Sequence, residues 1–208
     1  MMLTAGKQPV AYVSAGAGAA AIAASISWTH NITGNCLVVP VAAESNVSTA
    51  AVTAKVGTTT IPLIGKSSQP ITASGFFVWP TFFALLNPPT GSQTITLSIS
   101  GGGTAVLEGN SVCYDKVGSI GTMVTSNGSS SAPALSVPSG VGQMVVEMFT
   151  TWNTNPTGYT QTSRYSQNAG SPARGLLIGD APGASPSVSF SAASMDIWSA
   201  AAIPLLPF

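Results

Sequence analysis

The stretch from Phe76 to Ser100 constrains the fold of this chain more than any other part of the sequence. Its second half alternates strictly between aliphatic and hydroxyl side chains, which predicts a strand with one buried and one exposed face. The sequence Asn-Pro-Pro-Thr-Gly at 87–91 cannot continue a helix or a strand ladder, because proline lacks an N–H and restricts the residue before it. Five of the fifteen Phe, Trp and Tyr residues fall within 76–83. We therefore predict a strand, a turn and a second strand, forming a hairpin that anchors the core.

Similar alternation along the rest of the chain predicts an all-β protein. Residues 22–32 alternate up to a Thr-Gly-Asn turn, and the continuous apolar run from Cys36 to Ala43 is typical of a central strand, although Pro40 indicates a bulge or an edge. No amphipathic helix stands out. The expected fold is a single-domain antiparallel β-sandwich, jelly-roll-like, over residues 25–208. Residues 1–24 are expected to be an N-terminal arm and first strand region, with 1–9 as a loose arm or a short edge segment.

The chain carries unusually little charge. Charged residues make up 6% of its 208 residues and the formal net charge is zero, against roughly 25% in ordinary soluble domains. Such a chain has no electrostatic attraction for nucleic acid or for an acidic membrane surface, and no segment has the pattern of a membrane span. A surface of Ser, Thr, Gly and Ala repels copies of itself poorly, so we expect self-association. The alternative is a secreted protein with a Ser/Thr-rich face.

The sequence offers little for catalysis, cofactors or metals. His30 is the only histidine and falls within an alternating strand, so we expect a packing role in the core or at an edge. The six carboxylates are scattered singly, and we predict no catalytic, cofactor-binding or metal-ligating residue. Cys36 and Cys113 each lie in an apolar run. They are expected to be buried free thiols, with a disulfide as the alternative.

Two regions are candidates for surface contacts. The polar segment 153–172 and its border carry spaced aromatic and basic residues, and aromatic rings flanked by Asn, Gln and Arg suit polyhydroxylated ligands such as sugars. The alternative is that these side chains pack the loop against a neighbouring subunit. The chain ends in an apolar tail that we expect to be docked on this or another subunit. The candidate residues are Trp152, Tyr159, Arg164 and Tyr165 for surface binding, and Leu205, Leu206 and Phe208 for subunit contact.

The order of several segments resembles a family of phage proteins. The most specific pieces are LLNPPTG followed by TITLS, and the GDAPG turn before the last strands; SISWTHNITGNCLVVPVAAES, VPSGVGQMVVEMFTTW and IWSAAAIPLLP accompany them. Together these segments, over residues 25–207, resemble a β-sandwich domain of minor tail proteins from mycobacteriophages and other phages of actinobacteria. Related modules occur in bacterial surface proteins. The resemblance carries structural motifs and no catalytic residues.

This resemblance implies a virion structural protein that is not an enzyme. The expected place is the tail, with assembly in the host cytoplasm, self-association as a homo-oligomer such as a trimer, and contacts with other virion proteins or with a glycan of the host envelope. A capsid decoration protein on the head surface is the first alternative. A secreted carbohydrate-binding β-sandwich module is the second.

Overall fold

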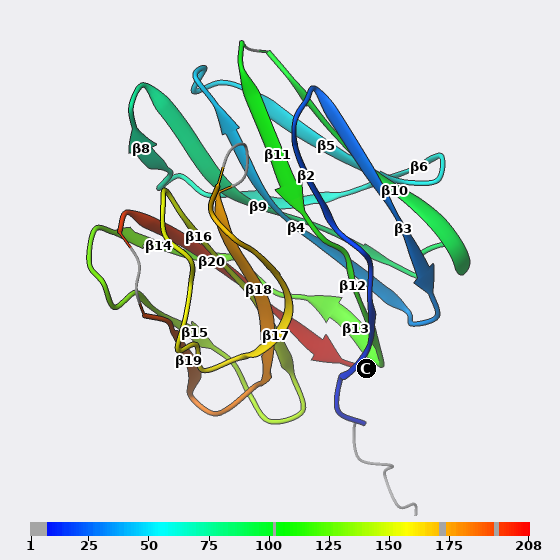
Figure 1. The fold of residues 1–208 in the computed structure, drawn as a ribbon. Helices are drawn as coiled ribbons and strands as arrows, with labels where there is room; N and C mark the ends of the chain where they lie inside the picture. Colours follow the sequence, from blue (N-terminus) through cyan, green and yellow to red (C-terminus); the bar gives the residue numbers. More distant parts are fainter. Residues whose placement is uncertain (1–7, 102, 171–173, 194–195) are drawn as a thin grey trace, which may run out of the picture.

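The computed structural model describes residues 8–101, 103–170, 174–193 and 196–208, and all the regular elements in these ranges are β-strands (Figure 1). Residues 1–7 of the predicted arm lie outside these ranges. Every strand pairing is antiparallel, and the strands form four sheets. The prediction of an antiparallel all-β sandwich is therefore confirmed.

The first two sheets are built from residues 11–115. Sheet A contains β1 (Ala11–Ala15), β2 (Ala19–Ile22), β4 (Cys36–Ser45), β7 (Leu63–Lys66), β8 (Ile71–Ala73), β9 (Phe76–Leu86), β11 (Ala105–Gly109) and β12 (Val112–Asp115). Sheet B has the order β3 (Ser25–Ile32), β10 (Gly91–Ser100), β5 (Ala51–Val56) and β6 (Thr59–Ile61). The region 1–24 thus contributes two strands, β1 and β2, to one edge of sheet A.

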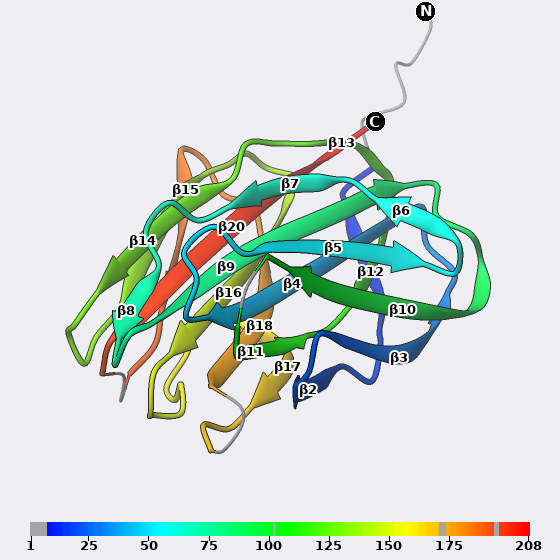
Figure 2. The same cartoon turned by 90° about the horizontal axis from the view of Figure 1, so that it is seen from above.

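The other two sheets are built from residues 117–207. Sheet C contains β13 (Val117–Ile120), β14 (Val124–Gly128), β16 (Met144–Thr151), β17 (Thr162–Gln167), β18 (Gly175–Pro182) and β20 (Trp198–Pro207). Sheet D consists of β15 (Ala134–Pro138) and β19 (Ser187–Ser191). Sheet B lies at one side of the molecule and sheet D at the other, with sheets A and C between them (Figures 1 and 2).

Three hydrophobic cores hold these four layers together. One core packs sheet A against sheet B, a second packs the opposite face of sheet A against sheet C, and a third packs the far face of sheet C against sheet D. Strands β4 and β16 are consequently buried along their entire length. Burial on both faces explains why the sequences of these strands are almost continuously apolar, whereas β3, in an outer sheet, alternates between buried apolar and exposed polar residues. Cys36 and Cys113 are buried free thiols, in the A–C and A–B cores respectively, and burial raises the pKa of Cys36 to about 12.

Three prolines lie inside the central strands β4, β9 and β20, where a missing N–H would normally break the ladder. Each occupies the point at which the neighbouring strand on one side gives way to the next. Pro40 lies where β12 gives way to β11, Pro80 where β8 gives way to β7, and Pro204 where β14 gives way to β13. At each junction the proline carbonyl still accepts a hydrogen bond from the linking residue, at 3.3, 2.8 and 2.8 Å. The interruption predicted at Pro40 is therefore in the neighbouring strand, and β4 remains central.

The predicted hairpin over 76–100 is wrong in its pairing. Both strands form as expected, but β9 pairs with β4, β7 and β8 in sheet A, whereas β10 pairs with β3 and β5 in sheet B. The turn at 87–90 crosses from one layer to the next. The reason is burial: β9 is apolar on both faces and belongs in an inner sheet, while β10 has one hydroxyl face that must remain in an outer sheet.

Candidate functional site

Arg164, one of the predicted binding residues, is held within the fold. It projects from β17 and its Nε and Nη2 donate to the two carboxylate oxygens of Asp180 on β18, at 2.8 and 2.9 Å. Its guanidinium also lies 3.5 Å from the centre of the Tyr12 ring on β1. Asp180 is buried, so the pair is a bidentate ion pair at the boundary of sheets A and C. Arg164 is thus committed to internal contacts.

Tyr114 extends this arrangement across the boundary between the layers. It lies on β12 of sheet A, is fully buried, and its hydroxyl donates to Asp180 Oδ2 at 2.8 Å. Burial is the main cause that raises the pKa of Tyr114 well above its usual range, and the negative charge of Asp180 adds to the increase. The phenol therefore remains a hydrogen-bond donor at ordinary pH. We call Tyr12, Tyr114, Arg164 and Asp180 the first clamp.

Trp152 belongs to a second set of contacts between the same two sheets. The Arg174 guanidinium lies 3.5 Å from the centre of the Trp152 ring, and its Nε forms an ion pair with Glu44 on β4. The backbone N–H of Arg174 donates to the Glu108 carboxylate on β11, with a nearest distance of 3.1 Å. Burial raises the pKa of Glu108 well above its usual range. The hydrogen bond from the Arg174 amide opposes this increase, and the nearby charge of Glu44 adds to it. We call Glu44, Glu108, Trp152 and Arg174 the second clamp.

The other two predicted binding residues differ in exposure. Tyr165 is half-buried and covers Gly18, where an added Cβ would lie 2.5 Å from the tyrosine ring. Tyr159 is 39% exposed. The structure therefore brings Trp152, Arg164 and Tyr165 to the A–C boundary and leaves Tyr159 at the surface. Three of the four predicted residues are therefore packed, as the alternative to sugar binding expected, but the contacts described here are with their own chain and not with a neighbouring subunit.

His30 forms a buried polar cluster between the edges of sheets A and B. It is 2% exposed, with Nε2 2.9 Å from the Ser14 hydroxyl and Nδ1 2.8 Å from the Ser111 hydroxyl. The indole N–H of Trp28 donates to the same Ser111 oxygen at 2.9 Å. Burial lowers the pKa of His30, which favours the neutral ring. His30 is a core histidine, as its strand position predicts, and its two serine partners are too distant in sequence to have been identified beforehand.

A second buried polar pair lies in sheet C. Glu147 on β16 is fully buried, and its Oε2 is 2.6 Å from the side-chain nitrogen of Gln161. The second carboxylate oxygen of Glu147 and the amide oxygen of Gln161 have no hydrogen-bond partner among the described residues. Burial raises the pKa of Glu147 well above its usual range, with the Gln161 bond opposing the shift. Glu147 is a single charged residue within an apolar strand, but nothing in the sequence indicates that Gln161 would be its hydrogen-bond partner.

The C-terminal tail is docked on its own chain. Pro207, Leu206 and Leu205 pair with β13, and Leu205 is fully buried in the A–C core. Phe208 is 71% exposed. Of the three residues predicted to contact another subunit, Leu205 is thus occupied internally and Phe208 remains accessible.

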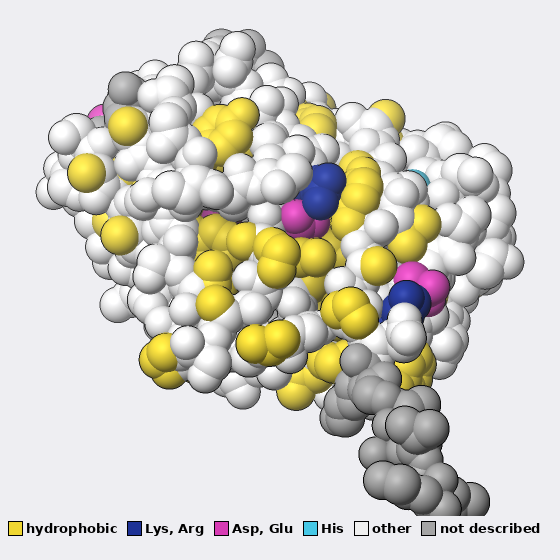
Figure 3. All heavy atoms as spheres, turned by 90° about the horizontal axis from the view of Figure 1, so that it is seen from below, with side chains coloured by type: hydrophobic (Ala, Val, Ile, Leu, Met, Phe, Trp, Pro, Cys, Tyr) yellow, Lys and Arg dark blue, Asp and Glu magenta, His cyan; other side chains and the backbone are white. Residues whose placement is uncertain are grey.

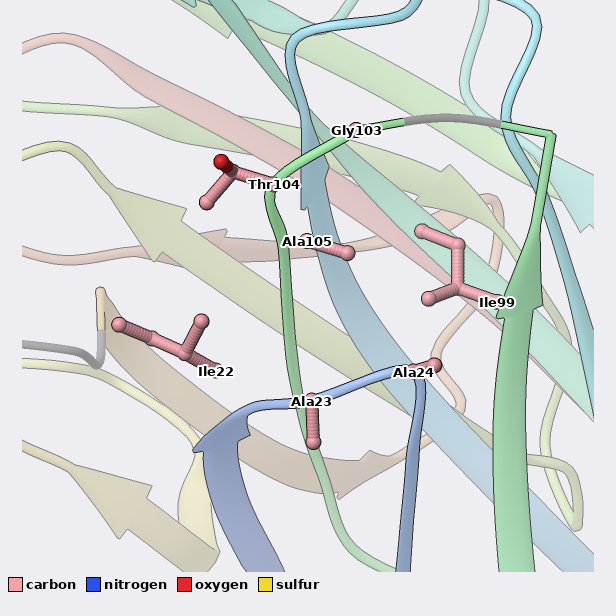
Figure 4. A pocket seen from close by; sticks show the side chains of 7 residues that line it. All are labelled: Ile22, Ala23, Ala24, Ile99, Gly103, Thr104 and Ala105. Atoms are coloured by element: carbon pink, nitrogen blue, oxygen red, sulfur yellow. The ribbon is translucent and has the colours of Figure 1, made fainter.

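One open hollow of about 390 Å³ lies near the β2–β3 and β10–β11 connections (Figure 4). Its lining is almost entirely small or aliphatic, with Thr104 as the one residue that has a polar side chain: Ile22, Ala23, Ala24, Ile99, Gly103, Thr104 and Ala105. None of these seven described lining residues has a titratable side chain or a thiol. We therefore assign it no chemistry.

Within the described ranges, no three His, Cys, Asp or Glu side chains gather closely enough to hold a metal ion. The same ranges contain no helix long and apolar enough to cross a membrane. Of the residues predicted to make surface or subunit contacts, Tyr159 and Phe208 are exposed.

Comparisons with protein-family models, curated proteins and solved structures gave no significant match for this chain.

Proposed function

We propose that this chain is a structural protein of a tailed-phage virion, with the role of a minor tail protein. It has the all-β architecture that the resemblance of its sequence segments to mycobacteriophage minor tail proteins implies. The proposal includes self-association into a homo-oligomer, contacts with other virion proteins, and contact with the host envelope.

The observation that carries this proposal is the location of the charged residues. Four of the six acidic residues are less than 5% exposed, and Arg164 and Arg174 are paired with two of them. A fifth, Asp196, accepts hydrogen bonds from two backbone amides and a threonine hydroxyl. The surface formed by the described residues therefore has even less free charge than the composition suggests (one face is shown in Figure 3). Such a surface favours association with other subunits, as a virion component requires.

The direct test is immunogold electron microscopy of intact particles of the phage that encodes the chain. We expect an antibody raised against the purified protein to label the tail. Antibody that has been absorbed with the same protein is the control and should give no label. Label over the head instead of the tail would favour the capsid decoration alternative, and no label on intact particles would contradict a virion role.

Self-association can be tested separately on the purified chain. Size-exclusion chromatography with light scattering should give a mass that is a multiple of the 20.8 kDa protomer. A Phe208→Ser variant tests whether the exposed tail residue contributes to that contact. A monomeric parent protein at all accessible concentrations would contradict the homo-oligomer part of the proposal.

A further inference from the structure

The outer face of sheet B is a regular array of hydroxyl groups. Alternate residues of these strands are buried in the A–B core, and the residues between them face outward. Every outward-facing position of β3 and β10 carries serine, threonine or asparagine, and β5 and β6 add a threonine each. The outward residues are Ser25, Ser27, Thr29 and Asn31 on β3, Ser92, Thr94, Thr96, Ser98 and Ser100 on β10, Thr53 on β5 and Thr60 on β6. We call this set the hydroxyl face.

The strand register aligns these hydroxyls in rows. Thr94 lies opposite Thr29, and Thr96 lies opposite Ser27 on one side and Lys55 on the other. The Ser25 and Ser98 hydroxyls are 3.1 Å apart. Neighbouring strands are about 4.8 Å apart and successive outward residues about 6.8 Å apart along a strand. The face therefore presents donors and acceptors at a two-dimensional repeat.

The hydroxyl face is supported by a well-ordered sheet. Strand β10 pairs with β3 through eight consecutive residue pairs and with β5 through six, without a register shift. Ile95 and Leu97 on its inner side are fully buried. Threonine side chains also have a restricted χ1 angle. Binding to such a face costs little conformational entropy, because the groups are already in position.

Charge and composition limit which partner fits this face. Lys55 is the one charged side chain that points outward from the four strands. Protein interfaces are enriched in aromatic residues, Met and Arg and are depleted in Ser. A neutral face of hydroxyls therefore matches neither a polyanion nor a typical protein partner.

We propose that the hydroxyl face binds a neutral polyhydroxylated polymer, that is, a glycan. Each hydroxyl can donate and accept, which matches the hydroxyl groups of sugar rings laid across the strands. The outward positions of β3, β10, β5 and β6 carry no aromatic ring to stack on a sugar, so each contact is weak and binding depends on many sugar units of one polymer. This inference deepens the envelope contact within the proposed function and rests on that function for the source of the glycan, while the binding itself is a property of the purified chain.

The test is surface plasmon resonance of the purified protein over immobilised dextran, mannan and arabinogalactan, with polygalacturonate and heparin as anionic polymers. We expect binding to at least one neutral polymer, with little dependence on salt, and no binding to the anionic ones. Replacing both Thr94 and Thr96 by valine keeps the shape and the strand propensity but removes two hydroxyls. This variant should bind roughly tenfold more weakly.

Two further variants separate the role of the hydroxyls from general effects. Thr96→Ser retains the hydroxyl and should retain binding, whereas Thr162→Val makes the same change at an exposed position of β17 and should bind like the parent. Circular dichroism and thermal unfolding establish that each variant is folded.

The inference is overturned if no neutral polymer binds the parent, if the double valine variant binds as tightly as the parent, or if binding disappears with added salt. A change in oligomeric mass caused by the double variant would identify the face as an interface between copies and would also overturn it. Virion labelling is unaffected by any of these results, so failure of this inference is distinguishable from failure of the proposed function.

Discussion

The Tyr114 hydroxyl donates a 2.8 Å hydrogen bond to Asp180, and this bond connects sheet A, built from residues 11–115, to sheet C, built from residues 117–207. Asp180 accepts from Arg164 as well, and Arg164 in turn lies over the ring of Tyr12 in sheet A. The second clamp repeats the relationship at Arg174. Charged groups, which are rare in this chain, thus join two layers that also share an apolar core.

Removing the Tyr114 hydroxyl should weaken the connection between sheets A and C. In Tyr114→Phe, Asp180 loses one donor while it stays buried, so we expect a loss of about 1–2 kcal/mol in the free energy of unfolding. Urea denaturation monitored by tryptophan fluorescence measures it. The matched control is Tyr159→Phe at an exposed tyrosine, which should change stability by less than about 0.5 kcal/mol. Equal stabilities for Tyr114→Phe and the parent would contradict the role of this bond.

Arg174→Met should lower the free energy of unfolding by more than the loss of a surface ion pair would. It leaves the buried Glu44 carboxylate without its cation and removes the contact with Trp152. We expect a loss of about 3 kcal/mol. The double variant Arg174→Met with Glu44→Gln should recover part of this loss, because no carboxylate is then left unpaired at Glu44. Additive effects of the two substitutions in urea denaturation would argue against coupling between them.

Glu147 should make the protein less stable as the pH rises. Its pKa in the folded state is raised by burial, so the folded protein binds a proton that the unfolded chain releases above a pKa of about 4.3. The free energy of unfolding should therefore fall between that pH and the raised folded pKa. Glu147→Gln removes this contribution, and the new amide can accept from the NH2 of Gln161 and donate to its carbonyl oxygen.

The measurement is the unfolding free energy of parent and Glu147→Gln across this pH range. The difference in favour of the variant should be smallest near pH 4 and should grow as pH increases. Glu108 is shifted in the same direction, so some slope should remain in the variant. A constant difference at every pH would contradict a raised Glu147 pKa in the folded protein.

His30 should act in the opposite direction. Its folded pKa is lowered by burial, so its contribution to stability is present above the unfolded pKa of about 6.5 and is lost as the pH falls below that value towards and through the folded pKa. Because it is the only histidine, its ring C–H signals can be followed without ambiguity in an NMR titration. The midpoint should lie below 6.5. A midpoint at or above the unfolded value would show that the ring is not desolvated in the cluster with Ser14 and Ser111.

The tail residues should differ sharply in their effects on stability. Leu205→Ala opens a cavity in the A–C core and should cost about 2–4 kcal/mol. Phe208→Ala removes a side chain that is 71% exposed and should cost less than about 0.5 kcal/mol. Leu206→Ala, at a half-buried position, should lie between them. Thermal unfolding of the three variants measures the order, and a large effect of Phe208 in a dilute monomer would contradict the docking described here.

Several features of this protein follow from local sequence alone. The alternation in β3 and β10 identifies both the strands and their exposed hydroxyl faces, because the side-chain period of an extended chain is fixed at two. The continuous apolar run of β4 identifies a strand buried on both faces. The position of His30 within an alternating strand indicates a packing role in the core or at an edge.

The arrangement of these strands was decided by tertiary structure. Strands β9 and β10 are neighbours in sequence but belong to different layers, because hydrophobic burial sorts doubly apolar strands into the inner sheets and single-faced strands into the outer ones. The partners of Arg164, Arg174 and Glu147 could likewise not be predicted from the sequence. A charged side chain that becomes buried needs a polar or oppositely charged partner. The sequence does not show which residue that partner is, because this depends on which sheets pack against each other.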